Sequence, residues 1–324
     1  MNKILILSSI LSFFLITFVK TNQLGHNFNG TLTRSVLKKW YPAYKKAQTI
    51  NLAKLNITHI DETIFDDVEK LDKLKHLYLR MNQLKYISKN LLNKCENLIE
   101  IHLDNNELTT LDSNLFDNVP NLKMIFLYNN KLERLDSNIF SKLTKLIELS
   151  LERNNLKTIE PTTFNGLTRL QELHLNDNQL TRLEPNTFKN MNKLLYLNLY
   201  NNQIESINQD LFTDLTNLIG LYLNNNRIRS IESNSFRNLN NLVHLDLNDN
   251  LITTLSGKTF TGLDRLSTLN LTNNMISTCG KSAFNHLKNV REIQMGNNPI
   301  VKTSFDYVSG LCKNNNLRCQ VTFN

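Results

Sequence analysis

A 24-residue period runs through most of this chain. Leucine recurs at that interval without a slip, at Leu74, Leu98, Leu122, Leu146, Leu170, Leu194, Leu218, Leu242 and Leu266. Such strict repetition is typical of a solenoid, in which each unit contacts only its two neighbours. One unit cannot bury its apolar residues alone, so we expect one elongated domain with a continuous core rather than a globule around a central core.

Residues 170–193 form one complete unit and read LQELHLNDNQLTRLEPNTFKNMNK. Leu173 and Leu175 are two residues apart, so on a short strand both point inward while their neighbours point outward. Asn178 follows where the strand must turn, and its amide carries the donors and the acceptor that buried backbone groups need. We therefore expect a structural role for this column, which comprises Asn82, Asn106, Asn130, Asn154, Asn178, Asn202, Asn226, Asn250, Asn274 and Asn298.

A phenylalanine marks the return side of most units. The column comprises Phe116, Phe140, Phe164, Phe188, Phe212, Phe236, Phe260 and Phe284. Because this side is bulkier than the strand side, it is expected to spread the coils apart and to leave the stacked strands on a concave surface.

The template resembles the leucine-rich repeat family, in the 24-residue form common in extracellular proteins, over about residues 47–300. The resemblance implies an α/β leucine-rich repeat solenoid: a right-handed curved superhelix with a concave parallel β-sheet and short helical or extended segments on the convex side. We divide the chain into a signal peptide (1–21), an N-terminal cap (22–46), eleven leucine-rich repeats (47–300) and a C-terminal cap (301–324). In the N-terminal cap, Pro42 is expected to end a helix that begins near Thr33.

The N-terminus has the outline of a secretory signal peptide. Lys3 precedes an uninterrupted apolar run from Ile4 to Val19, and Lys20 ends it. The run is shorter than a comfortable membrane span. We therefore expect a secreted, extracellular protein without stable membrane insertion after cleavage, with a retained membrane anchor as the alternative.

Secretion would permit disulfides among the four cysteines. Cys312 and Cys319 lie in the tail and are expected to close a short loop over the last coil, which resembles a reduced form of the family's cysteine-rich C-terminal cap. A bond from Cys279 to a tail cysteine is the alternative. Cys95 occupies an apolar slot of its unit and is expected to be a buried, unreactive thiol.

Three sequons predict N-glycosylation, at Asn29, Asn56 and Asn270. The repeat phase puts Asn270 on the concave strand face. A glycan there would block ligand approach and move binding toward the earlier units.

The outward strand positions are where the sequence stops repeating, and variable positions on a rigid scaffold can carry specificity. Six aromatic residues are expected to face solvent there as binding hot spots: Tyr78, Phe126, Tyr128, Tyr196, Tyr200 and Tyr222. The alternative is that they pack against one another along the sheet. The full set of predicted ligand-binding residues is Tyr78, His102, Phe126, Tyr128, Glu148, Glu152, Arg153, Glu172, His174, Tyr196, Tyr200 and Tyr222.

Charge on this face opposes that of the whole chain, whose formal net charge is +8. The outward positions carry many acids, including Glu100, Asp104 and Asp246, against only Arg80 and Arg153. Nucleic acid is therefore a poor ligand, and a protein or other macromolecule with basic and apolar groups fits better. The function expected is noncatalytic recognition of a receptor-like, innate-immune or adhesive kind; the alternatives are an extracellular-matrix scaffold and a membrane-tethered receptor ectodomain.

One pair of residues superficially suggests catalysis. Ser150 and His174 are expected side by side on adjacent strands, near Glu148 and Glu172. An open sheet offers no obvious oxyanion hole or water-excluding pocket, so we expect no enzyme activity. The groupings of His76 with His102, and of His244 with two aspartates, lack a closed ligand set, so neither a metal nor a cofactor is expected.

Overall fold

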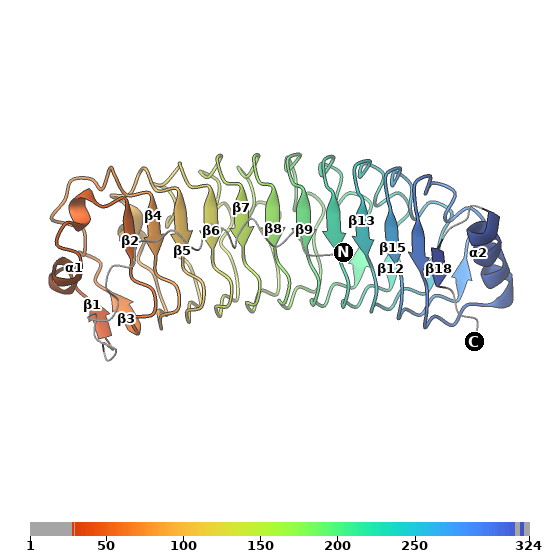
Figure 1. Cartoon of the computed structure of the whole chain (residues 1–324), viewed down its shortest axis with the longest axis horizontal. Helices are drawn as coiled ribbons and strands as arrows, with labels where there is room; N and C mark the ends of the chain where they lie inside the picture. Colours follow the sequence, from red (N-terminus) through yellow and green to blue (C-terminus); the bar gives the residue numbers. More distant parts are fainter. Residues whose placement is uncertain (1–27, 29, 315–317, 321–324) are drawn as a thin grey trace.

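The computed structural model of the chain describes residue 28, residues 30–314 and residues 318–320. They form one elongated, curved solenoid with a helix at each end (Figure 1). The predicted signal peptide, residues 1–21, and the sequon asparagine Asn29 lie outside the described residues.

A parallel sheet of twelve strands runs along the solenoid. Neighbouring strands are offset by one repeat, so that Leu149 on β7 faces Leu173 on β8 in the register. The α/β solenoid predicted from the period is confirmed. The strands in spatial order are β2 (Thr49–Asn51), β4 (His76–Tyr78), β5 (Glu100–His102), β6 (Met124–Phe126), β7 (Glu148–Ser150), β8 (Glu172–His174), β9 (Tyr196–Asn198), β11 (Gly220–Tyr222), β13 (His244–Asp246), β15 (Thr268–Asn270), β17 (Glu292–Gln294) and β18 (Arg318–Gln320).

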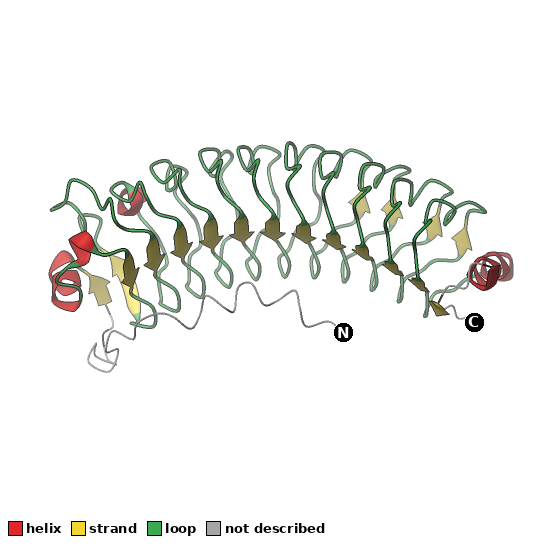
Figure 2. Cartoon of the chain, turned by 45° about the horizontal axis from the view of Figure 1, so that its top comes forward, coloured by secondary structure: helices red, strands yellow, loops and turns green. Residues whose placement is uncertain are grey.

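The interior of each coil is filled by the inward-facing leucines and the phenylalanine column. Leu149, Leu173 and Leu197 are fully buried. Phe188 stacks between Phe164 and Phe212, with ring centroids 6.2 Å and 6.3 Å away. The strands line the inside of the arc and the loops form its outside (Figure 2), as the bulk of the phenylalanine side predicts.

The asparagine column is buried and joins successive coils. Asn178 is 8% exposed; its Oδ1 accepts from the Leu156 N–H at 3.0 Å, and its Nδ2 donates to the Leu151 carbonyl at 3.0 Å and the Leu175 carbonyl at 3.1 Å. The same pattern recurs from Asn82 to Asn298. The structural role predicted for this column is confirmed.

The convex side is made mainly of turns. Within residues 47–300, all of which are described, the only helix is the 3-10 helix η4 (Lys89–Leu92). Two short parallel ribbons lie on this side in the later repeats: β10 (Ser206–Ile207) with β12 (Ser230–Ile231), and β14 (Thr254–Leu255) with β16 (Thr278–Cys279). The convex segments are therefore extended far more often than helical.

The first coil is covered by β1 (Gly30–Leu32), which pairs with β3 (Ile57–Ile60), and by α1 (Arg34–Trp40) and the 3-10 helix η3 (Tyr44–Lys46). Thr33 caps α1 by accepting from the Val36 N–H. The helix ends two residues before Pro42, as predicted. Leu37 and Tyr44 are buried against the core.

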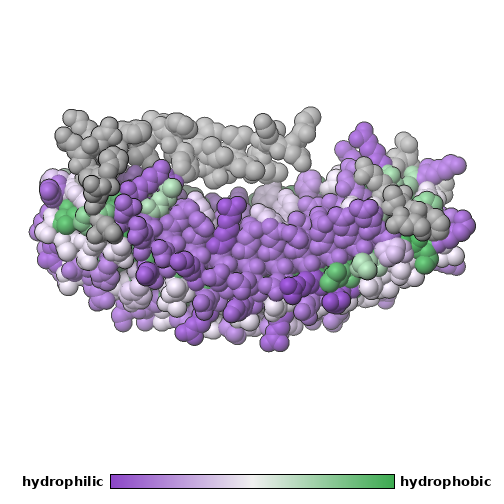
Figure 3. Space-filling view, turned by 90° about the horizontal axis from the view of Figure 1, so that it is seen from below, coloured by the Kyte–Doolittle hydropathy of each residue, from purple (hydrophilic) through white to green (hydrophobic). Residues whose placement is uncertain are grey.

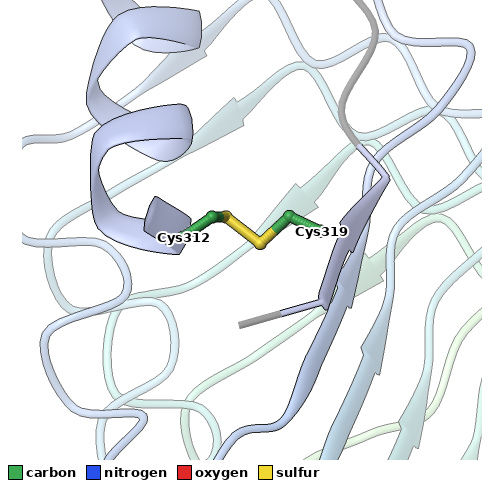
Figure 4. The surroundings of a disulfide bond; sticks show 2 residues. All are labelled: Cys312 and Cys319. Atoms are coloured by element: carbon green, nitrogen blue, oxygen red, sulfur yellow. A yellow bond between two sulfur atoms is a disulfide. The ribbon is translucent and has the colours of Figure 1, made fainter. Parts of the chain in front are cut away.

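The last coil is covered by α2 (Lys302–Asn314) and β18. The predicted bond between Cys312 and Cys319 joins them, with a Cα–Cα distance of 6.1 Å (Figure 4). Cys279 is not in a disulfide, so the alternative pairing is wrong for this structure. Burial raises the pKa of the Cys95 thiol to about 12, which makes it a poor nucleophile.

One flank of the solenoid is hydrophilic along most of its length, and hydrophobic residues gather there only near the two ends (Figure 3). Among residues 28, 30–314 and 318–320, no helix combines the length and the hydrophobicity needed to cross a bilayer.

Candidate functional site

The register of the sheet arranges the outward side chains as a grid. Every second residue of a short strand points away from the core, and each neighbouring strand repeats the position about 4.8 Å further on. Residues 24 apart in sequence therefore lie side by side, as Glu148 and Glu172 do, and as Ser150 and His174 do. The structure brings together most of the predicted ligand-binding residues on β6 to β9 and the turns that follow these strands.

An aromatic stack occupies the grid at β4 to β6. The His102 ring lies 4.7 Å from the Tyr78 ring and 4.3 Å from the Phe126 ring, measured between centroids. His102 is only 7% exposed and Phe126 only 9%. The prediction that Phe126 faces solvent is wrong, because neighbouring rings on adjacent strands cover it. The His102 side chain is buried for the same reason. For this part of the face the alternative, mutual packing along the sheet, holds.

A hydrogen-bonded chain of imidazoles and carboxylates lies beside this stack. Glu100 Oε2 is 2.9 Å from His76 Nδ1, Glu100 Oε1 is 2.5 Å from His102 Nε2, and His102 Nδ1 is 3.3 Å from Asp104 Oδ1. Burial opposes ionisation of Glu100, but the hydrogen bonds from the two histidines outweigh it and hold the Glu100 pKa at about 2. Burial also opposes charging of His102, yet its bonds to Asp104 and Glu100 raise its pKa.

Because of these hydrogen bonds, the concave face presents less negative charge to a ligand than the sequence predicts. Asp104 is fully buried, and its carboxylate accepts from Asn105 as well as contacting His102. Glu100 is hydrogen-bonded to two histidines, His76 and His102. The carboxylates left to interact with a ligand are therefore fewer than the sequence indicates, and they lie further along the sheet.

A hollow of about 310 Å³ opens on the concave side next to β6 to β9. Tyr128 and Tyr200 stand three repeats apart, and Glu152 and Asn176 occupy the equivalent positions of the two repeats between them. The complete lining is Tyr128, Glu152, Arg153, His174, Asn176, Asn198 and Tyr200. The two tyrosines are half-buried rather than fully exposed.

Negative charge accumulates at this hollow. Burial, together with the neighbouring charge of Glu172, raises the pKa of Glu148. Burial likewise raises the pKa of Glu152, whose Oε2 is shielded from solvent and has no hydrogen-bond partner among the described residues. Arg153 is exposed at the rim, and no ion pair joins it to a carboxylate in the described part of the chain.

His174 is held by two neighbours. Its Nδ1 is 2.7 Å from Asn198 Nδ2, and its Nε2 is 3.4 Å from Glu172 Oε2. Burial disfavours the imidazolium, but Glu172, Glu152 and Glu148 outweigh burial and raise the His174 pKa. Both ring nitrogens face these neighbours, and among the described residues neither is hydrogen-bonded to Ser150, which is 4% exposed. The serine–histidine adjacency therefore lacks the bond a nucleophile needs.

Glycine shapes the sheet beyond the hollow. Gly220 on β11 faces Tyr196 on β9 in the register. A Cβ at this glycine would lie 2.9 Å from the Tyr196 ring and 3.1 Å from the Tyr222 ring. The glycine thus gives these two predicted contact residues room to lie over the strand, where both are half-buried.

Comparison with known proteins agrees with this geometry. The family model described as "Leucine rich repeat" matches seven overlapping segments, which together span residues 96–300 of the 324-residue chain. The chain belongs to the leucine-rich repeat family. A search of curated proteins found no match to this leucine-rich repeat protein.

Solved structures share its fold at low sequence identity. The chain in an octameric complex of Latrophilin 3, Unc5D and FLRT2 (LRR) is 22% identical with a TM-score of 0.72, over 85% of this chain and 84% of that one. A leucine-rich repeat protein of Leptospira interrogans is 24% identical with a TM-score of 0.64, over 90% and 75%. A chain of the TLR13–ssRNA13 complex is 20% identical with a TM-score of 0.52, over 91% and 52%.

Two predicted sequons of this leucine-rich repeat protein can be placed. Asn56 is exposed on a turn with φ of 55°. Asn270 lies on β15 as the repeat phase predicts, and its Nδ2 donates to Asn248 Oδ1 at 3.1 Å. Glycosylation of either stays a prediction.

One possible cation-binding cluster was not predicted from the sequence. Ligand atoms of Glu148, Glu172 and His174 lie within 4.8 Å of one another, which is close enough for a shared cation. The sequence predicts these three residues close together, around the pairing of Ser150 with His174, but it was not interpreted as a possible cation cluster. Glu172 and His174 lie 24 and 26 residues after Glu148. Applied across neighbouring strands, the 24-residue register would therefore have identified the cluster.

Proposed function

We propose that this leucine-rich repeat protein is a noncatalytic recognition protein that acts outside the cell. Its partner is a protein with basic and apolar surface groups, which binds to the concave sheet. The single observation that carries the proposal is the hollow between Tyr128 and Tyr200, since it combines aromatic rings with the Glu152 carboxylate, one oxygen of which has no hydrogen-bond partner among the described residues.

Tyrosine suits such a surface because its ring offers apolar area while its hydroxyl stays in contact with water. Tyr128 and Tyr200 remain partly accessible, whereas Tyr78 is covered on one side by His102. The centre of binding is therefore placed at β6 to β11, which includes Glu148, Glu172 and Tyr222.

A nucleic acid is the competing ligand class, because one structural neighbour was solved with single-stranded RNA. Phosphate groups would meet Glu152 in the hollow and Glu148 and Glu172 beside it, opposed only by Arg153 and by His174 when it is protonated. Like charges brought together in this way disfavour the complex. At 20% identity, the similarity to that neighbour shows a shared fold and not a shared ligand.

An extracellular-matrix scaffold is the second candidate function. It would use several surfaces at once, including the hydrophilic flank. A membrane-tethered receptor ectodomain is the third, and it would keep the N-terminal segment uncleaved, which N-terminal sequencing of purified protein tests directly.

Capture of partners from the native extracellular fluid tests the proposal. Wild-type protein is compared with Tyr128→Ala/Tyr200→Ala, and Tyr86→Ala serves as the control, since Tyr86 is 41% exposed and lies outside the sheet. Recognition predicts a protein that survives nuclease treatment and is lost with the double variant but kept with the control. Equal capture by all three proteins would contradict recognition through the concave face.

A further inference from the structure

The hollow next to β6 to β9 has a shape and a charge that go beyond a general binding face. It is hollowed rather than flat, and two tyrosines line it together with polar and charged side chains. At about 310 Å³ it is large enough for a long side chain to enter together with water.

The carboxylates beside the hollow repel one another in the unbound protein. Glu148 and Glu172 face each other across β7 and β8, and Glu152 adds a third carboxylate from the turn after β7. Arg153 and a protonated His174 offset part of this charge, but no ion pair within the described residues joins Arg153 to it. A cation entering the hollow would meet the Glu152 carboxylate, with Glu148 and Glu172 beside it.

One oxygen of Glu152 is left without a donor. Its Oε2 is closed off from solvent and bonded to no described residue. Buried polar atoms in native proteins nearly always have a partner, so an exception needs an explanation. Because this oxygen is closed off from solvent, a donor brought by the ligand can reach it only when the Glu152 side chain turns toward the hollow that it lines.

We propose that the hollow receives an arginine side chain of the partner protein, with its guanidinium stacked on Tyr128 and bonded to Glu152 of the neighbouring repeat. This inference rests on the proposed function and names the group that the concave face selects. Guanidinium fits because it is planar, carries five donors, stacks on aromatic faces and is weakly hydrated. Lysine offers a compact and strongly hydrated charge that cannot stack in the same way.

Capped peptides test this directly. The probes are acetyl-Leu-Arg-Leu-amide, the same peptide with citrulline in place of arginine, and the same peptide with lysine. Citrulline keeps the shape of arginine and removes its charge. Full-length protein labelled with 3-fluorotyrosine gives one fluorine resonance for each of its nine tyrosines. Tyr128→Phe and Tyr200→Phe assign the two resonances that matter.

The arginine peptide is expected to shift the Tyr128 resonance more than the Tyr200 resonance and to bind about tenfold or more tightly than the citrulline peptide, as charged hydrogen bonds allow. The lysine peptide is expected to bind more weakly than the arginine peptide. Glu152→Gln is expected to remove the arginine preference, whereas the matched control Glu133→Gln, at an exposed position outside the sheet, keeps it. Circular dichroism verifies that both variants are folded.

Equal binding of the arginine and citrulline peptides would overturn the inference, and so would equal binding of arginine and lysine. Shifts caused by calcium chloride with none from the arginine peptide would also overturn it, in favour of a divalent-cation site. Failure of the arginine inference can be told apart from failure of the proposed function. If Glu152→Gln keeps partner capture while Tyr128→Ala/Tyr200→Ala loses it, only the arginine inference is wrong.

Discussion

Asn178 is tied to Leu151 of the preceding coil by a hydrogen bond of 3.0 Å from its side-chain amide to the Leu151 carbonyl. It also satisfies Leu156 and Leu175, so three backbone groups depend on one side chain. The solenoid is thus held by repeated polar bonds as well as by its apolar core.

Asn178→Ala is expected to lower the free energy of unfolding by about 1 to 3 kcal/mol, because it leaves buried backbone groups unsatisfied. Urea denaturation measures this change. Asn192→Ala, at an exposed position of the same unit, is the control and should have no effect. Equal stability of both variants would contradict the role assigned to the asparagine column.

The Glu100–His102 contact predicts a stability contribution that depends on pH. The Glu100 pKa is lowered from 4.5 to about 2, so its stabilisation is present above pH 4.5 and is lost as the pH falls toward 2. The His102 pKa is raised, so its stabilisation is present below 6.5 and is lost as the pH rises through the folded-state pKa. The contact should stabilise most between about pH 4.5 and 6.5.

Glu100→Gln is therefore expected to destabilise the protein by about 2 kcal/mol in that window, in line with a charged hydrogen bond, and by less on either side. Thermal unfolding from pH 3 to pH 9 measures the difference. A difference that stays constant across this range would show that the variant acts through packing rather than through charge.

Glu148→Gln is expected to stabilise the protein at pH 8, by on the order of 0.5 kcal/mol. Its raised pKa means that the wild-type protein loses stability as the pH rises through that pKa, and glutamine escapes the repulsion by Glu172. The gain should vanish at pH 4, where carboxyls become protonated. A loss of stability at pH 8 would mean that the Glu148 charge has a favourable partner.

Cys312→Ser is expected to loosen the C-terminal end by about 2 kcal/mol, given the short loop that the bond closes across a sequence separation of seven. In a solenoid each unit contacts only its neighbours, so the effect should stay local. Hydrogen exchange should quicken in β17 and remain unchanged in β8. Faster exchange throughout the sheet would contradict this local effect.

The sequence predicts the fold well because one constraint repeats. Leu173, Asn178 and Phe188 each recur at the same phase, and stacking then fixes the register, the buried asparagines and the curvature. The bond between Cys312 and Cys319 was likewise predicted, from their short separation in the tail.

The site was harder to predict because exposure on a concave sheet depends on neighbouring columns. Phe126 points outward by phase but is covered by His102, which lies 24 residues earlier. Asp104 has an outward phase as well, and its contacts with His102 and Asn105 bury it. The hollow combines the small Asn176 and Asn198 with two tyrosines from different repeats, a combination across four repeats that no single unit contains.

Site-specific photocrosslinking tests recognition by the concave face most directly. A benzoylphenylalanine replaces Asn224, which lies just beyond β11 on the concave face, or Asn192, which is exposed outside the sheet. Irradiation in the native extracellular fluid should give a discrete protein adduct from position 224 and none from position 192. Adducts from position 192 alone would contradict the account.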